Sequence, residues 1–158
     1  MPRDRRKVER RIIEPDARYK SVLLSQMINK MMLDGKKIKT TQLIYKALDE
    51  VHDKTKKDGL EVLEKALRNI TPALEVKSRR IGGATYQIPV EVKGRRKNHL
   101  AITWMRDAAR ARKGKSFDHL LAAEIIDAYN ETGTAFKRKE DTHKMADANK
   151  AFAHFARY

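Results

Sequence analysis

The sequence has no cysteine, few aromatic residues and no long hydrophobic run. Without cysteine it has no disulfide framework, no thiolate nucleophile and no thiolate metal site. Its apolar runs are only a few residues long, whereas a helix that crosses a bilayer needs roughly 18. We therefore expect no membrane segment. The first residues, MPRDRRKVERR, have no apolar segment behind their positive charges and predict no secretory signal, so we expect a cytoplasmic protein.

Motifs for catalysis and cofactor binding are also missing. The letters GKS at Gly114–Ser116 match the end of a phosphate-binding loop, but Ala109 stands where that loop requires glycine. The five histidines are scattered, without an HExxH pair or a cysteine partner, which argues against a metal site. The trio Asp141–His143 lacks a convincing nucleophile. We therefore predict that the protein is not an enzyme and has no cofactor or metal.

Positive charge is abundant and unevenly distributed along the chain. The net charge is +15 and the pI is near 10.1. Residues 77–115 carry twelve Lys or Arg against two acids, whereas residues 34–76 balance nine basic with eight acidic side chains. Residues 116–133 carry four acids and no base. Solubility needs no such segregation, so the pattern favours a face that binds a polyanion over a merely solvated surface.

The length and the hydrophobic pattern predict one mainly α-helical domain. At 158 residues, 41% of them hydrophobic, the chain can bury a single core. Residues 1–18 show no periodicity and predict a basic arm, whereas residues 19–158 have apolar residues at steps of three and four, typical of about six helices. We place these helices at 19–33, 38–52, 58–71, from 94–98 to 113, at 116–132, and from 134 onward.

One segment breaks the helical pattern. At about residues 74–92, between the third and fourth helices, apolar residues recur at every second position and predict a β-hairpin. Gly82 and Gly83 can adopt the positive φ angles of its turn. Pro89 cannot donate a ladder hydrogen bond, which fits a sheet of two strands that are both edges. Because such a ribbon is marginal in water, we expect a partner to cover its face.

Basic side chains gather on the hairpin and on the fourth helix. Arg79 and Arg80 would lie at the hairpin tip, and a stripe that includes Arg106 and Arg110 would point away from the core. A second cluster, residues 137–139, falls in the first turns of the sixth helix, where a bound phosphate would remove its conflict with the helix dipole. The candidate nucleic-acid contacts are Arg3, Arg5, Arg6, Lys7, Arg10, Arg11, Lys36, Lys37, Lys77, Arg79, Arg80, Gly82, Gly83, Lys93, Arg95, Arg96, Lys97, Arg106, Arg110, Arg112, Lys113, Lys115, Lys137, Arg138 and Lys139.

Folded RNA is the partner that this arrangement favours. Only Tyr86 and Trp104 are aromatic within the positive region, so a stacking platform for single strands is poorly supported. A protruding hairpin and a basic arm suit an irregular RNA surface. A helical module that reads duplex DNA stays open as an alternative. An RNA-modifying enzyme is a third reading, although the sequence offers it no cofactor loop and no acid and base pair.

Three stretches carry a family resemblance: INKMMLDGKK at 28–37, RRIGGATYQIPVEV at 79–92, and LAAEIIDAYNETGTAFKRKEDTHKMADANKAFAHF at 121–155. Through these stretches nearly the whole chain resembles the bacterial small-subunit ribosomal protein seven family. The arm and residues 93–98 are the least similar part, since Gly94 stands near the place where the family has a proline after the hairpin.

The resemblance implies a helical domain with one extended hairpin that binds the 3′ domain of small-subunit ribosomal RNA and nucleates assembly of the head. It implies a hairpin near the tRNA exit site and the path of messenger RNA, and small-subunit proteins nine and eleven as neighbours, without a homo-oligomer in the ribosome. The contacts that it implies are Lys77, Arg79, Arg80, Gly82, Gly83 and the 137–139 cluster.

Overall fold

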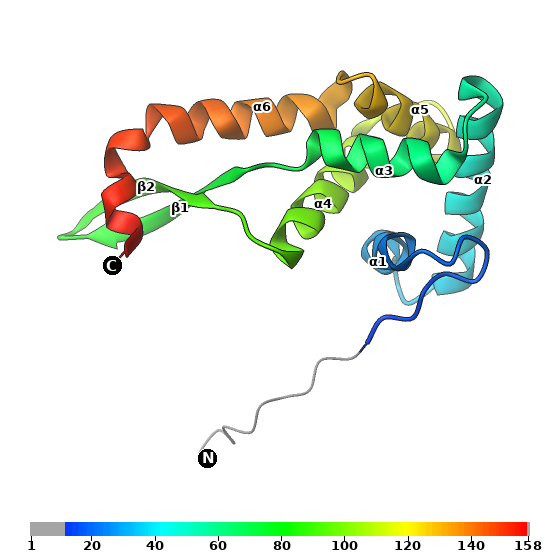
Figure 1. Cartoon of the computed structure of the whole chain (residues 1–158), viewed down its shortest axis with the longest axis horizontal. Coiled ribbons are helices and arrows are strands. Elements are labelled where there is room, and N and C mark those ends of the chain that lie inside the picture. The colour runs from blue at the N-terminus through cyan, green and yellow to red at the C-terminus, as the bar shows by residue number, and fades with distance from the viewer. Residues whose placement is uncertain (1–11, 158) are drawn as a thin grey trace, which may run out of the picture.

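The computed structural model describes residues 12–157, which form six α-helices, one 3₁₀ helix and a two-stranded sheet (Figure 1). In chain order the elements are α1 (Val22–Met31), α2 (Lys37–Thr55), α3 (Gly59–Ile70), β1 (Leu74–Ile81), β2 (Ala84–Glu91), α4 (Arg95–Ala111), α5 (Phe117–Tyr129), α6 (Gly133–Ala148) and η1 (Lys150–Arg157). The predicted fold class, mainly α with a hairpin between the third and fourth helices, is confirmed. Among residues 12–157 no helix is both long and apolar enough to cross a membrane.

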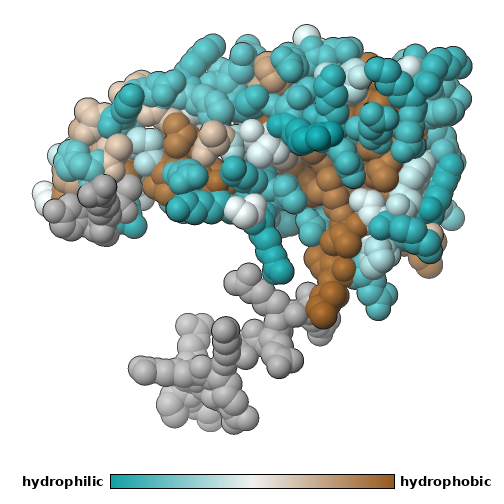
Figure 2. Space-filling view, viewed as in Figure 1, coloured by the Kyte–Doolittle hydropathy of each residue, from teal (hydrophilic) through white to brown (hydrophobic). Residues whose placement is uncertain are grey.

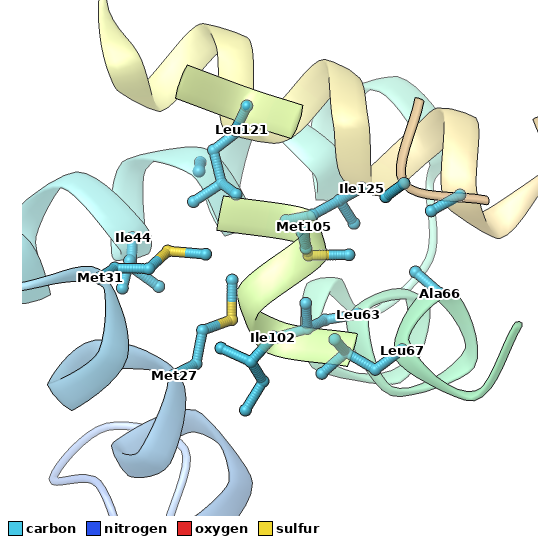
Figure 3. Close-up of a cluster of buried hydrophobic side chains, with 14 of the residues drawn as sticks. Met27, Met31, Ile44, Leu63, Ala66, Leu67, Ile102, Met105, Leu121 and Ile125 are labelled. Carbon is cyan, nitrogen blue, oxygen red and sulfur yellow. The ribbon is translucent and has the colours of Figure 1, made fainter. Parts of the chain in front are cut away.

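Helices α1–α5 form a body from which the hairpin projects, and α6 and η1 lie alongside the hairpin (Figure 1). One face of each body helix supplies the core, and Figure 3 shows side chains from all five meeting there. Met27, Met31 and Met105 are at most 3% exposed and pack among the apolar side chains of this core. Each fully buried side chain of this size contributes about 1.5–3 kcal/mol to folding.

Helix α1 begins three residues later than the periodicity predicts. Lys20 has a φ of +52°, a left-handed conformation that a helix interior does not contain. Ser21 then caps the helix, and its hydroxyl accepts a hydrogen bond from the backbone N–H of Leu24 at 3.4 Å. A local polar cap therefore decides the first residue of α1, although the apolar pattern extends beyond it.

The other helix boundaries lie within three residues of the predictions, with the largest shifts at the ends of α2, at Thr55, and of α5, at Tyr129. Asp58 caps α3 as predicted, accepting from a backbone N–H of the first turn. Ser116 lies at the predicted N-cap of α5, but its hydroxyl donates to the carboxylate of Asp118 instead of accepting from a backbone N–H. The predicted sixth helical stretch is divided at Asn149 into α6 and η1.

The hairpin has the predicted two strands and the predicted turn. Ile81 pairs with Ala84, so Gly82 and Gly83 alone form the loop, with φ angles of +56° and +90°. Two consecutive positive φ angles are typical of the type I′ turn, whose twist matches that of the flanking strands. Pro89 lies opposite Val76 in a sheet that has two strands among residues 12–157.

The hairpin face is covered by this chain itself, which corrects our expectation that a partner would cover it. The ring of Tyr86 lies 5.2 Å from that of Phe152 and 5.7 Å from that of Phe155, both in η1. Ile88 and Val92 are at most 1% exposed. The C-terminal elements thus supply the apolar surface that a two-stranded ribbon needs to be stable.

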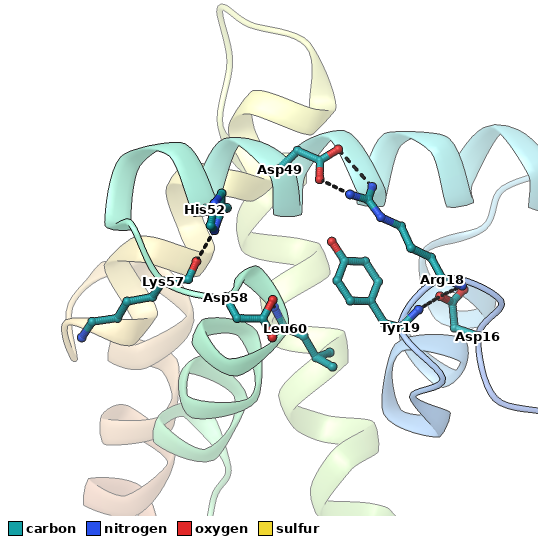
Figure 4. A network of polar contacts seen from close by, with 8 residues as sticks. All are labelled: Asp16, Arg18, Tyr19, Asp49, His52, Lys57, Asp58 and Leu60. Atoms are coloured by element: carbon teal, nitrogen blue, oxygen red, sulfur yellow. Dashed lines mark hydrogen bonds and ion pairs between the residues drawn. The ribbon is translucent and has the colours of Figure 1, made fainter.

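The last residues of the predicted arm, 16–18, contact α2 (Figure 4). Asp16 is 6% exposed, and its carboxylate accepts from the hydroxyl of Tyr45 and from the backbone N–H groups of Arg18 and Tyr19. The guanidinium of Arg18 donates two hydrogen bonds to Asp49, at 2.7 and 3.1 Å. These bonds fix where the chain enters the body.

Candidate nucleic-acid interface

Helix α4 is the element on which the basic side chains converge, and the hairpin leads directly into it. Gly94, with a φ of +49°, turns the chain from β2 into α4. Glu75 of β1 is 7% exposed and accepts from the Nε and Nη2 atoms of Arg96, at 3.1 and 2.9 Å. Its other oxygen lies 3.1 Å from Nζ of Lys77. This carboxylate therefore fixes the base of the hairpin against the start of α4.

Two arginines of the stripe predicted along α4 lie outside the core and contact the end of α1. A guanidinium nitrogen of Arg110 donates to the backbone carbonyl of Met31 at 2.9 Å, and one of Arg106 reaches the carbonyl of Lys30 at 3.5 Å. These carbonyls end α1 and have no partner within their own helix, so the arginines supply one. Both arginines consequently hold α1 and α4 together.

A groove between α1, α4 and the first described residues is lined by further basic side chains. Lys30, Arg95 and His99 line it together. Burial lowers the pKa of His99, and the nearby charges of Lys30, Arg96 and Arg106 lower it further. The imidazole of His99 is therefore disfavoured in its charged form first by burial and then by three nearby cations, which lie around the same groove.

A second groove continues the positive surface past the other end of α4. Arg110 lines it with Lys36 and Lys39, which lie at the start of α2. Lys36 also lies 3.7 Å from the exposed carboxylate of Asp34, a pair that water and salt screen. We use the name basic strip for the series that runs from the hairpin base along α4 to α2. The basic strip consists of Lys77, Arg96, Arg95, Lys30, Arg106, Arg110, Lys36 and Lys39.

The start of α4 lies between the hairpin and α1, and Figure 2 shows this side of the molecule hollowed, with hydrophilic side chains along its border (Figures 1 and 2). Arg79 and Arg80 are exposed near the hairpin tip, beside the glycine turn. Lys93 is exposed and pairs with Glu91 at 3.6 Å, whereas Lys97 is half-buried. The hairpin and the start of α4, which carry many of the predicted contacts, therefore border this hollow.

Arg112 was predicted as a nucleic-acid contact, but the structure engages it inside the protein. Its Nε donates to Glu124 at 2.8 Å, and its Nη2 contacts both Glu124 and Asp127. Glu124 is fully buried, and its other oxygen accepts from the backbone N–H of Ala135 at 2.9 Å. Burial alone would lower the pKa of Arg112, but the two carboxylates raise it. Arg112 thus joins the loop after α4 to α5 and to the start of α6.

The 137–139 cluster on α6 is partly engaged by other groups of the protein, and Asp107, which pairs with Arg138, also pairs with Arg106 of the basic strip. Lys139 donates to the backbone carbonyl of Asn69 at 2.7 Å, near the end of α3. Arg138 lies 3.9 Å from the carboxylate of Asp107, and Lys137 is exposed. Lys139 therefore joins α6 to the end of α3, a structural role in addition to the predicted phosphate contact.

The remaining predicted contacts divide between exposed positions and positions that the structure does not describe. Lys37, Lys113 and Lys115 are exposed. Six contacts predicted on the arm lie outside the described residues: Arg3, Arg5, Arg6, Lys7, Arg10 and Arg11.

Sequence reasoning missed Lys30 and Lys39, which line the two grooves. Lys30 falls in the last turn of α1 and is the only charged residue of that helix. Its neighbours in space, Arg95 and His99, are more than sixty residues away in the chain. A local signal was available only for Lys39, which follows Lys36 and Lys37 closely.

Known proteins match the chain along almost its whole length. The family described as ribosomal protein S7p/S5e matches residues 2–150. The small ribosomal subunit protein uS7 of Chloroflexus aggregans is 58% identical over 157 residues, which are 99% of each chain. The proteins of the same name from Thermotoga petrophila and Treponema pallidum are 54% and 52% identical, each over 96% of this chain and 97% of the relative. The chain therefore belongs to the ribosomal protein S7p/S5e family, and it is a structural protein of the ribosome rather than an enzyme.

Proposed function

We propose that the protein binds the 3′ domain of small-subunit ribosomal RNA through its basic strip and hairpin, and that this binding nucleates assembly of the head. As a ribosomal protein it works in the cytoplasm, where the small subunit takes part in translation. The observation that carries the proposal is the basic strip. Its side chains come from β1, α1, α2 and α4, distant in sequence, and several of them line grooves at the two ends of α4.

The chemistry of the strip supports an RNA ligand. Phosphate contacts supply most of the affinity for nucleic acid, and each phosphate that a protein cation neutralises releases counterions. The strip is also anchored: Arg96, Arg106 and Arg110 are held by hydrogen bonds to Glu75 and to the end of α1. A rigid array of cations loses less conformational entropy on binding, and it favours an RNA whose phosphates have a matching arrangement.

The hairpin supports the finer part of the proposal. It extends from the body with Arg79 and Arg80 exposed near its end, so it can reach RNA that the body does not touch. We propose that this end lies near the tRNA exit site and the path of messenger RNA, and that small-subunit proteins nine and eleven are neighbours of the bound protein. The same proposal gives the protein one copy in the ribosome, not a homo-oligomer.

Matched double variants test the basic strip. Lys30→Ala with Arg95→Ala removes two cations from the groove, whereas Lys46→Ala with Lys144→Ala removes two exposed lysines outside the strip. We expect the first pair to weaken binding to a 3′-domain RNA fragment and to reduce the slope of log affinity against log salt by about two. The control pair should leave affinity and slope close to those of the unchanged protein. Equal effects of the two pairs would remove the strip from the interface.

Two further measurements address the nature of the RNA and the position of the hairpin. Competition between the 3′-domain fragment and duplex DNA at roughly 0.15 M salt should favour the RNA, and stronger competition by DNA would contradict the proposal. Photocrosslinks from a reactive residue at position 80 in assembled small subunits should map to nucleotides at the exit site. Crosslinks confined to other regions would remove the hairpin from that site.

A further inference from the structure

The groove that contains Lys30 and Arg95 has an apolar wall as well as a basic rim. Its volume is about 570 Å³, within the range of about 300–1,000 Å³ that is typical of small-ligand pockets. Ile12, Ile13 and Val22 line one part of it and are 93%, 39% and 44% exposed. Figure 2 shows brown surface running upward from the first described residues beside hydrophilic side chains. Large apolar side chains that remain in water next to cations indicate a ligand with both an apolar and an anionic part.

Two side-chain amides lie in the same groove. Gln26 and Asn29, both on α1, line it together with the apolar wall. Each amide offers an NH₂ donor and a carbonyl acceptor, and this combination matches the donor and acceptor edges of nucleobases. A lipid tail would leave these groups without hydrogen bonds, which disfavours such a ligand.

The rim of the groove can hold a phosphate and the face of a base. Lys30 and Arg95 provide charge, and Arg95 and His99 provide planar groups on which an unstacked base can lie. Arg96 and Arg106 add positive charge close to His99. The phosphate of a nucleotide would thus meet cations at the rim while its base met isoleucine side chains and amides inside.

We propose that this groove takes one unpaired nucleotide of a folded RNA, with its base against Ile12, Ile13 and Val22 and its phosphate on Lys30 and Arg95. The inference rests on the proposed function, because it names the kind of RNA element that one part of the interface recognises. It adds a local requirement for a base to an interface that otherwise reads charge and shape. The amides of Gln26 and Asn29 would select among bases by their edges.

Short RNA duplexes test this proposal in the full-length protein. One duplex is fully paired, four carry a central single-nucleotide bulge of A, C, G or U, and one carries an abasic bulge. The abasic duplex has the bend and the phosphates of a bulge but no base. We expect at least one bulged duplex to bind about tenfold or more tightly than the abasic one, because contacts to a single base are worth this much.

A double variant locates the effect in the groove. Gln26→Ala with Asn29→Ala should remove most of the preference for the favoured bulge and leave the affinity for the paired duplex unchanged. The control is Gln42→Ala with Asn98→Ala, which removes the same two side-chain types from positions that do not line the groove. This control should retain the preference. Circular dichroism establishes that both variants have the helical content of the unchanged protein.

The outcomes separate the two proposals. Equal binding of abasic and base-containing bulges, or an unchanged preference in the groove variant, overturns the nucleotide pocket while charge-based RNA binding stands. Absence of salt-dependent binding to any duplex or to the 3′-domain fragment overturns both. A photoreactive residue at position 26 should attach to a nucleotide in assembled small subunits, and attachment to a protein instead overturns the proposed occupant.

Discussion

Replacing Arg112 with alanine tests whether this arginine stabilises the fold or contacts RNA. In the structure it bridges Glu124, which is fully buried, and Asp127, which is 39% exposed. The substitution would leave the Glu124 carboxylate in the interior with one remaining hydrogen bond, from the N–H of Ala135 at 2.9 Å. A buried carboxylate that loses its cationic partner is costly, since neither water nor another charge replaces it.

The magnitude follows from the burial of the two carboxylates. Removing one partner of a buried ion pair costs about 3–5 kcal/mol. Because Asp127 is partly exposed, water compensates its share, so we expect a loss of about 3–4 kcal/mol. A domain of this size is stable by about 5–15 kcal/mol in total. The melting temperature should accordingly fall by roughly 6–16 °C.

Urea unfolding followed by circular dichroism measures this loss, as a lower midpoint with an unchanged m-value. Arg80→Ala, an exposed arginine of the hairpin, is the matched control and should unfold at the midpoint of the unchanged protein. In the absence of urea, folded Arg112→Ala should bind the 3′-domain RNA fragment with unchanged affinity. Arg112→Ala should thus lower the stability without changing the RNA affinity, whereas Arg80→Ala should leave the stability unchanged.

A rescue variant distinguishes charge burial from lost packing. Arg112→Met combined with Glu124→Gln removes both charges and keeps an oxygen that can accept from Ala135, so it should recover more than half of the lost stability. A result of normal stability and reduced RNA affinity for Arg112→Ala would refute the reasoning. In that case Arg112 would be an RNA contact, as its sequence context predicts.

Three further changes follow from particular contacts. Gly133→Ala should lower the unfolding free energy by about 1–2 kcal/mol or more, because Gly133 has a φ of +88° and an added Cβ would lie 2.9 Å from Cβ of Asp127; urea midpoints measure this. Burial alone would raise the pKa of Glu75, but Arg96 and Lys77 lower this pKa below its ordinary value of about 4.3. The ionised carboxylate therefore stabilises the fold fully above about pH 4.3, and this stabilisation is lost as the pH falls through the lowered pKa. Glu75→Gln should therefore be less stable than the unchanged protein at neutral pH, and the difference in unfolding free energy should shrink in acid; a constant difference would contradict this. Tyr86→Ala should speed amide hydrogen exchange in the hairpin, because it removes the ring contact with Phe152 that covers the sheet, whereas exchange in α2 should be unaffected.

The sequence alone determined the order and kind of the elements from α1 to α6, whereas η1 was predicted as the continuation of the sixth helix. Apolar spacing of three and four predicted the six α-helices, and spacing of two with adjacent Gly82 and Gly83 predicted the hairpin and its turn. These signals are local, because side-chain direction repeats with a fixed period in each element and few residues tolerate positive φ. Charge segregation along the chain also indicates a polyanion as the partner.

Tertiary structure alone decided what each cation meets. Arg95 is the first residue of α4 and Arg112 directly follows its last, yet Arg112 is held by the carboxylates of α5 whereas Arg95 lines an open groove with Lys30. The hairpin is likewise covered by Phe152, which lies more than sixty residues after its contact Tyr86 in the chain. The periodicity of apolar residues predicts whether a side chain points toward the core or toward solvent. The group that this side chain contacts, however, comes from a distant part of the chain. Only the packing of α1, α4, α5 and η1 brings those parts together.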